Sequence, residues 1–171
     1  MNEEDARVIL SMGIVPNEPR EGTPDDILRH FGTNDGHELG LRLIKDAVRR
    51  KDGYDVALAM MVCHAFGYTM DHFDVLVELS YADWHKKHED VVSNLGKLKA
   101  PAAVEALYHA TQWIPDYLDY DDDRTLASKA IWALGGTPGP EAERALVRLA
   151  DSENEMLKEE AGYQLERRGV R

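Results

Sequence analysis

Two stretches of this chain share a spacing of landmarks that decides the fold: LGKLKAP at residues 95–101 and LGGTPGP at residues 134–140. The second stretch lies 39 residues after the first, and an Ala-Leu pair that follows each of them, at 106–107 and 145–146, keeps the same offset. Each stretch sets a glycine near the end of one apolar helical pattern and a proline near the start of the next. Self-similarity at a fixed period predicts a repeat architecture.

The repeating unit is a pair of helices. Apolar residues recur at three- and four-residue spacing along the chain, and strand patterns are nearly absent. Units are predicted at residues 70–99, 100–139 and 140–170, and a more divergent copy is predicted at 37–69. Residues 1–36 lack the repeat and are expected to form an N-terminal helical cap. One pair alone exposes an apolar face, so neighbouring pairs must stack to bury it.

The predicted fold class is therefore all-α: a right-handed α-solenoid of stacked antiparallel helix pairs in a single domain over residues 1–171. Local signals set the expected boundaries. Thr23 and Pro24 are typical of an N-cap and a first helical position. Gly67 and Gly135 are predicted C-caps. Helices are expected to end near Phe66, Leu98, Leu134 and Arg167.

The 100–139 unit contains an insertion near residues 112–123, rich in aspartates and aromatics. Aspartates before the next helix would stabilise its dipole, and the aromatics could pack beneath the loop. Calcium binding is conceivable, although no Asp-x-Asp-x-Asp-Gly loop is present. Aromatic anchors among acids also suit a basic protein partner. The candidate partner-binding residues are Trp113, Asp116, Tyr117, Asp119, Tyr120, Asp121, Asp122 and Asp123.

The charge balance favours a basic protein partner over other binding classes. Thirty-two acidic residues stand against 20 lysines and arginines in 171 residues, a formal charge of −12. Nucleic acids and anionic membranes require a positive surface, so neither is an expected partner. The acidic N-terminus is unlike a signal peptide, and no apolar run reaches the length of a membrane span. A cytoplasmic protein is expected.

Five histidines and the single cysteine are candidates for site chemistry. His85 and His88 are spaced to share one helix face, and that spacing could hold a metal ion, but zinc would need further ligands. The two lysines between them favour a solvated face, so no metal site and no cofactor are predicted. Cys63 lies in an apolar run without a base or a positive neighbour, and a core position is expected. His64, His72 and His109 are interpreted as hydrogen-bonded histidines at helix contacts. No catalytic residue is predicted.

The second half of the chain resembles the short HEAT-like repeats of bilin lyases. Those repeats have an alanine and then a Leu-Gly near the end of the second helix, a turn with proline, and a Leu-x-x-Leu core in the next helix. The residues that carry the resemblance here are Ala130, Leu134, Gly135, Pro138, Pro140, Leu146 and Leu149. It covers roughly 100 residues, implies the solenoid fold, and says almost nothing about function.

Two functional hypotheses stay open at this point. The first is a non-enzymatic protein-binding module, an immunity protein (antitoxin) that neutralises a basic toxin such as a nuclease. The second is a HEAT-like enzyme or nucleic-acid factor, similar to DNA glycosylases or bilin lyases, in which Trp113, Trp132 and Asp116 could take part. The net charge opposes DNA docking, so the first is preferred.

Overall fold

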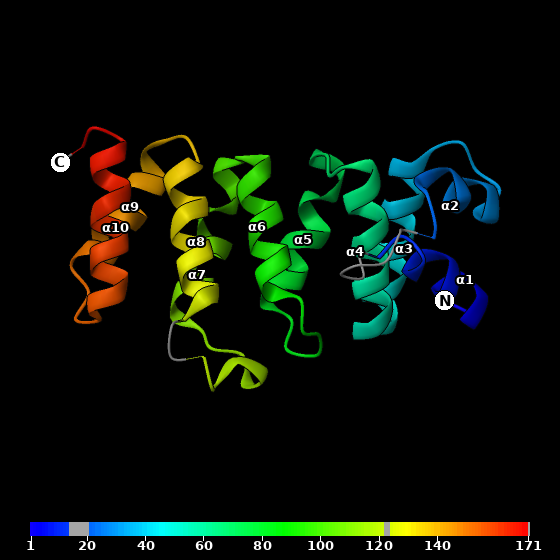
Figure 1. Ribbon diagram of the computed structural model, residues 1–171. Helices are drawn as coiled ribbons and strands as arrows, with labels where there is room; N and C mark the ends of the chain where they lie inside the picture. The colour runs from blue at the N-terminus through cyan, green and yellow to red at the C-terminus, as the bar shows by residue number, and fades with distance from the viewer. Residues whose placement is uncertain (14–20, 122–123, 171) are drawn as a thin grey trace. The chain divides into compact units, whose positions relative to one another are not determined.

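The structure is a computed structural model that describes residues 1–13, 21–121 and 124–170. All regular structure in these residues is helical, and they contain no strand (Figure 1). The described residues also contain no helix long and apolar enough to cross a membrane. The chain divides into two compact units, Met1–Val75 and Leu76–Arg171, with helix α5 (Phe73–Tyr81) across the division.

The first unit holds the predicted cap and the divergent helix pair. Its α-helices are α1 (Glu3–Leu10), α2 (Pro24–Phe31), α3 (Gly36–Arg50) and α4 (Gly53–Phe66), followed by the 3-10 turn η1 (Met70–His72). Thr23 caps α2 as predicted, because its side chain accepts from the Asp26 backbone N–H while Asp26 accepts from the Thr23 backbone N–H. The core of this unit forms mainly where α3 packs against α4.

The second unit holds the remaining pairs. Besides the end of α5, its elements are α6 (His88–Leu98), η2 (Pro101–Ala103), α7 (Val104–Gln112), η3 (Asp116–Leu118), α8 (Thr125–Gly136), α9 (Pro140–Ala150) and α10 (Glu155–Arg167). Helix α8 packs against α6, α7, α9 and α10, so it is the centre of the unit. Figure 1 shows α6, α8 and α10 side by side, with α7 and α9 in a second layer.

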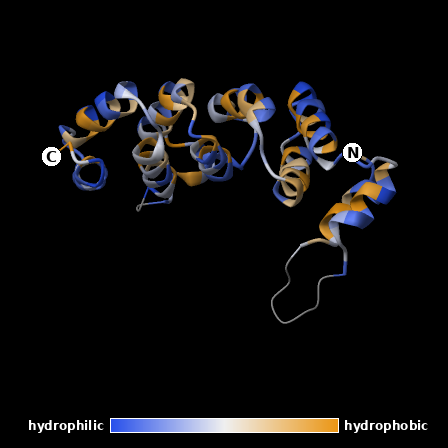
Figure 2. Cartoon of the chain, turned by 90° about the horizontal axis from the view of Figure 1, so that it is seen from above, coloured by the Kyte–Doolittle hydropathy of each residue, from blue (hydrophilic) through white to orange (hydrophobic). Residues whose placement is uncertain are grey.

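The helix pattern follows the amphipathic spacing of the sequence. Hydrophobic and hydrophilic residues occupy different faces of the helices (Figure 2), and the apolar faces supply the buried core. The members of the α8 core are Leu126, Ala127, Ala130, Ile131, Ala133 and Leu134, and each is buried.

The predicted helix ends agree with the structure at α4, α6 and α10, which end at Phe66, Leu98 and Arg167. Gly67 is the C-cap of α4, with a φ of 92°. The predicted C-cap at Gly135 is wrong, because α8 continues to Gly136 and is capped by Thr137.

A side chain from α10's end explains that difference. The guanidinium of Arg168 donates to the carbonyl oxygens of Gly135 and Thr137, at 3.1 and 2.6 Å. Helix ends leave carbonyls without intrahelical partners. Here a distant arginine supplies the donors, so α8 needs no left-handed glycine at this point.

Candidate functional site

Residues 113–124, which connect α7 to α8 in the second unit, are called the insertion loop. Its described part projects beyond the ends of these two helices (Figure 1). Its described residues begin after Gln112 and include the single turn η3. Two of its own residues, Pro115 and Leu118, are buried. The loop is therefore a packed segment with an inner and an outer side.

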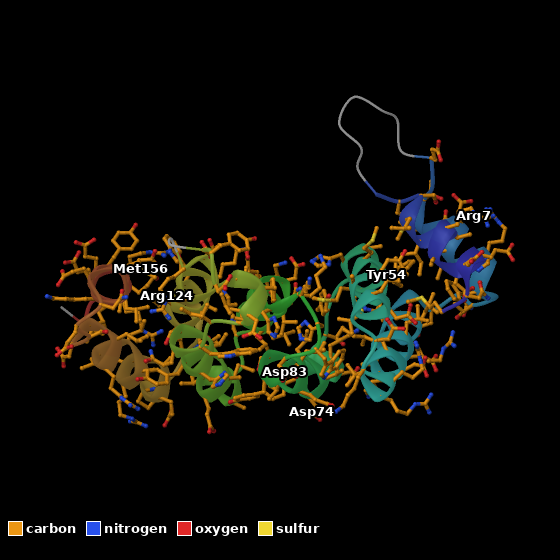
Figure 3. All side chains as sticks on the ribbon, turned by 90° about the horizontal axis from the view of Figure 1, so that it is seen from below. Arg7, Tyr54, Asp74, Asp83, Arg124 and Met156 are labelled. Carbon is orange, nitrogen blue, oxygen red and sulfur yellow. The ribbon has the colours of Figure 1, made fainter. Side chains whose placement is uncertain are left out.

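Two hydrogen bonds hold the C-terminal end of the insertion loop. The carboxylate of Asp121 accepts from the backbone N–H of Thr125, the first residue of α8, at 2.7 Å. Arg124, labelled in Figure 3, has a left-handed φ of 50°. Its guanidinium donates to the carbonyl of Thr111 at 2.9 Å, so the end of the loop is tied back to α7.

The inner side of the loop rests on a buried histidine at the start of α6. The Nε2 atom of His88 lies 2.6 Å from the carbonyl oxygen of Ala82, and a ring nitrogen in that position must donate. The neutral ring therefore accepts at Nδ1, where the Tyr117 hydroxyl is 3.1 Å away. The oxygen of that hydroxyl accepts from the backbone N–H of His88 at 3.3 Å. One tyrosine hydroxyl thus meets both the ring and the backbone of His88.

A second histidine stacks beneath the first. The ring centroids of His85 and His88 are 4.1 Å apart and the rings are nearly parallel. His85 donates from Nε2 to the carbonyl of Leu79 at 2.8 Å and accepts at Nδ1 from the backbone N–H of Lys87 at 3.0 Å. Both of its ring nitrogens are used within the protein. Trp113 adds an edge-on contact to His88, with the centroids 4.9 Å apart.

Burial sets the electrostatics of this cluster. Only 1% of the surface of His85 and of His88 is exposed to solvent. Loss of hydration disfavours the charged imidazolium. Burial lowers the pKa of His88 to about 4, with a smaller contribution from His85. It also lowers the pKa of His85 and raises that of the Tyr117 phenol. The cluster is neutral at physiological pH.

These contacts correct the interpretation of His85 and His88 as a solvated face. The two histidines point inward because the segment before α6 folds back, so that Ala82 and Leu79 offer carbonyl oxygens to the rings. The described residues contain no group of three or more histidine, cysteine, aspartate or glutamate side chains arranged to hold a metal ion. The expected core position of Cys63 is confirmed: it is buried on α4, and burial raises its thiol pKa to about 12.

The candidate residues divide between the two sides of the loop. Trp113 and Tyr117 lie on the inner side, where they contact the histidines, and Asp121 accepts from the first backbone N–H of α8. The outer side presents Asp116, Asp119 and Tyr120, all exposed. Asp122 and Asp123 lie outside the described residues.

The outer side combines charge with apolar area. Tyr120 is 77% exposed and Ile114 is 48% exposed, values that are high for large apolar side chains. No described lysine or arginine lies within ion-pair distance of Asp116 or Asp119, and both carboxylates are free to meet another molecule. Ile114 was not predicted as a site residue, because an isoleucine that continues an apolar helical stripe is expected in the core. The histidines beneath the loop were missed as its support, although their regular spacing was the available signal.

The comparisons with known proteins identify no relative of this chain. No family model, no curated protein sequence and no solved structure matches the chain.

Proposed function

We propose that this chain is a non-enzymatic protein-binding module that captures a basic protein through the outer side of its insertion loop. In this proposal the helix pairs stack as a right-handed HEAT-like solenoid and serve as the scaffold. The function that fits best is that of an immunity protein, which binds a basic toxin in the cytoplasm and neutralises it. A nuclease toxin would suit the charge, because its substrate groove is itself cationic.

One observation carries the proposal: the loop is tied down on its inner side while its outer side stays open. Tyr117, Asp121 and Arg124 make the holding hydrogen bonds, at 2.7–3.1 Å. A loop ordered before binding loses less conformational entropy when a partner arrives. Exposed Tyr120 and Ile114 are the kind of apolar surface that a partner can bury.

The chemistry of the outer side selects the partner. Asp116 and Asp119 belong to a chain with a formal charge of −12, so a cationic protein is drawn in by the long-range field as well as by these carboxylates. Tyrosine in an interface combines a large apolar contact with a polar tip and is frequent among residues that dominate binding energy. Tyr120 is the expected anchor of the loop.

The test uses the product of the reading frame next to the gene for this chain, and it measures both growth rescue and affinity. Asp116→Asn, Asp119→Asn and Tyr120→Ala should each weaken binding, with Tyr120→Ala costing on the order of 2 kcal/mol. Matched controls are Glu153→Gln, an exposed acid on another loop, and Tyr54→Ala, an exposed tyrosine in the first unit (Figure 3).

The outcomes test the proposed immunity function and the proposed binding surface separately. Rescue by the parent and failure of the loop variants would support both. Rescue that all three loop variants retain would reject the loop as the binding surface. A neighbouring product that is neither toxic nor bound by this chain would reject the immunity function.

A further inference from the structure

A second surface of the same unit has the opposite charge. Helices α6 and α8 border a groove of about 400 Å³. Its lining includes three lysines, Lys97, Lys99 and Lys129, together with Trp132, Gly96 and Ala133. We call these residues the lysine groove. None of the described residues that line it carries a carboxylate.

Helices α6 and α8 approach closely at Gly96 and Ala133, within the lysine groove. A Cβ atom added to Gly96 would lie 2.7 Å from the Cβ of Ala133, which is closer than real contacts allow. Glycine lets the α6 backbone approach α8 at this point. The lining residues belong to α6 and α8, except Lys99, which directly follows α6.

The charge of the groove is only partly balanced. Lys129 pairs with Glu89 on α6 at 2.5 Å. Lys97 donates to the uncharged Asn94 side chain at 3.0 Å. No described carboxylate lies within 4.0 Å of the ammonium group of Lys97 or Lys99. Cations at the end of a helix stabilise its dipole, which accounts for Lys97 and Lys99 but not for the aromatic surface beside them.

That aromatic surface extends the groove toward α10. Trp132 is 49% exposed, Tyr163 is 51% exposed, and their ring centroids are 5.8 Å apart. The guanidinium of Arg167 lies over the Trp132 ring at 5.2 Å and over the Tyr163 ring at 5.9 Å. Such a guanidinium is held in place by the rings, and its salt-bridge capacity is unused among the described residues. Beside the exposed Trp132 therefore lie a positioned arginine and two lysines that have no carboxylate partner among the described residues.

We propose that the lysine groove binds an acidic peptide segment of a second protein partner, with carboxylates on Lys97, Lys99 and Arg167 and an apolar side chain on Trp132. Charge complementarity selects this occupant. A nucleic acid strand is the other polyanion that suits lysines and aromatics, but its charge extends far beyond the groove. The −12 charge of the chain would repel the remainder of such a strand, whereas a short peptide meets only the cationic strip.

This surface is independent of the insertion loop and of the basic partner proposed for it. The loop precedes α8, whereas Lys97 and Lys99 lie at the end of α6 and Arg167 ends α10. The chain would then hold a basic protein at one surface and an acidic segment at another. Failure of one surface leaves the other testable.

The experiment is a fluorescence anisotropy titration of the full chain. The probe is a fluorescein-labelled peptide of aspartates and glutamates with one central phenylalanine, and its Asn/Gln counterpart is the uncharged control. Lys97→Glu should weaken binding of the acidic probe by about tenfold, because reversal replaces attraction by repulsion at an exposed pair. Trp132→Ala should weaken it by about fivefold.

The matched control is Lys86→Glu, which makes the same charge change before the start of α6, at the end opposite Lys97. Unfolding measurements on each variant separate loss of binding from loss of fold. Equal weakening by Lys86→Glu and Lys97→Glu would show a general charge effect and overturn the proposal. So would absence of saturable binding, or tighter binding of a single-stranded oligothymidylate of the same charge, which would identify the groove as a nucleic-acid surface.

Discussion

Removal of one oxygen tests whether the insertion loop is held from beneath. Tyr117→Phe deletes the hydroxyl that lies 3.1 Å from Nδ1 of His88 and 3.3 Å from its backbone nitrogen. The ring nitrogen then has no donor, and the backbone N–H at the start of α6 has no acceptor. Leaving a buried polar group unpaired costs about 1–3 kcal/mol. The longer of the two bonds, at 3.3 Å, is weak, so we expect a total loss of about 2 kcal/mol of unfolding free energy.

The assay is urea unfolding followed by circular dichroism, with the parent and the variant at the same pH. Tyr120→Phe is the control, because the Tyr120 side chain is 77% exposed and its hydroxyl has no hydrogen-bond partner among the described residues. That variant should keep the parent's stability. If Tyr117→Phe also unfolds within about 0.5 kcal/mol of the parent, the hydroxyl does not hold the loop and the support assigned to His88 is incorrect.

Three further perturbations probe the fold and the buried cluster. Burial lowers the folded-state pKa of His88 from 6.5 to about 4. Between these pH values the unfolded chain therefore binds more protons than the folded chain. The free energy of unfolding should fall by about 3 kcal/mol as the pH drops from 6.5 to 4. A flat urea-unfolding profile from pH 7 to pH 4 would refute this. Gly96→Ala should destabilise the protein by about 1–3 kcal/mol, because the added Cβ would lie 2.7 Å from that of Ala133. Gly162→Ala should stabilise it by up to about 1 kcal/mol, because the space around its Cβ is open. Melting temperatures of the two variants that shift in the same direction would contradict the close packing at Gly96. Leu134→Ala should cost about 2–5 kcal/mol, and a cost under about 0.5 kcal/mol by denaturant unfolding would mean that the residue is not core.

Much of the helix arrangement could be predicted because its signals are local. Gly67 ends α4 through a left-handed φ, and Pro140 opens α9 at its first position. Each residue acts on the backbone within one turn. The end of α8 departs from the prediction because the interaction that fixes it is not local. Arg168 donates to carbonyl oxygens at the end of α8 from more than thirty residues away, and no pattern in the sequence around Gly135 indicates this contact.

The candidate site depends on the same kind of distant contact. His88 and Tyr117 are separated by 29 residues. The lysines between His85 and His88 predicted a solvated face, whereas the structure buries both histidines. The composition of the insertion loop could be recognised from sequence, but its inner and outer sides could not. The lysine groove was missed as well, because Lys97 and Trp132 come from different predicted units and lie on one surface only after α6 packs on α8.

The central claim is that the outer side of the insertion loop receives a basic protein. Its most direct test is the association rate constant with the product of the neighbouring reading frame, measured across a range of salt concentrations for the parent and for the Asp116→Asn/Asp119→Asn double variant. The account predicts that the parent's rate falls as salt rises, and that the double variant associates more slowly at low salt with a flatter dependence. Identical rates and identical salt dependence for the two proteins would contradict it.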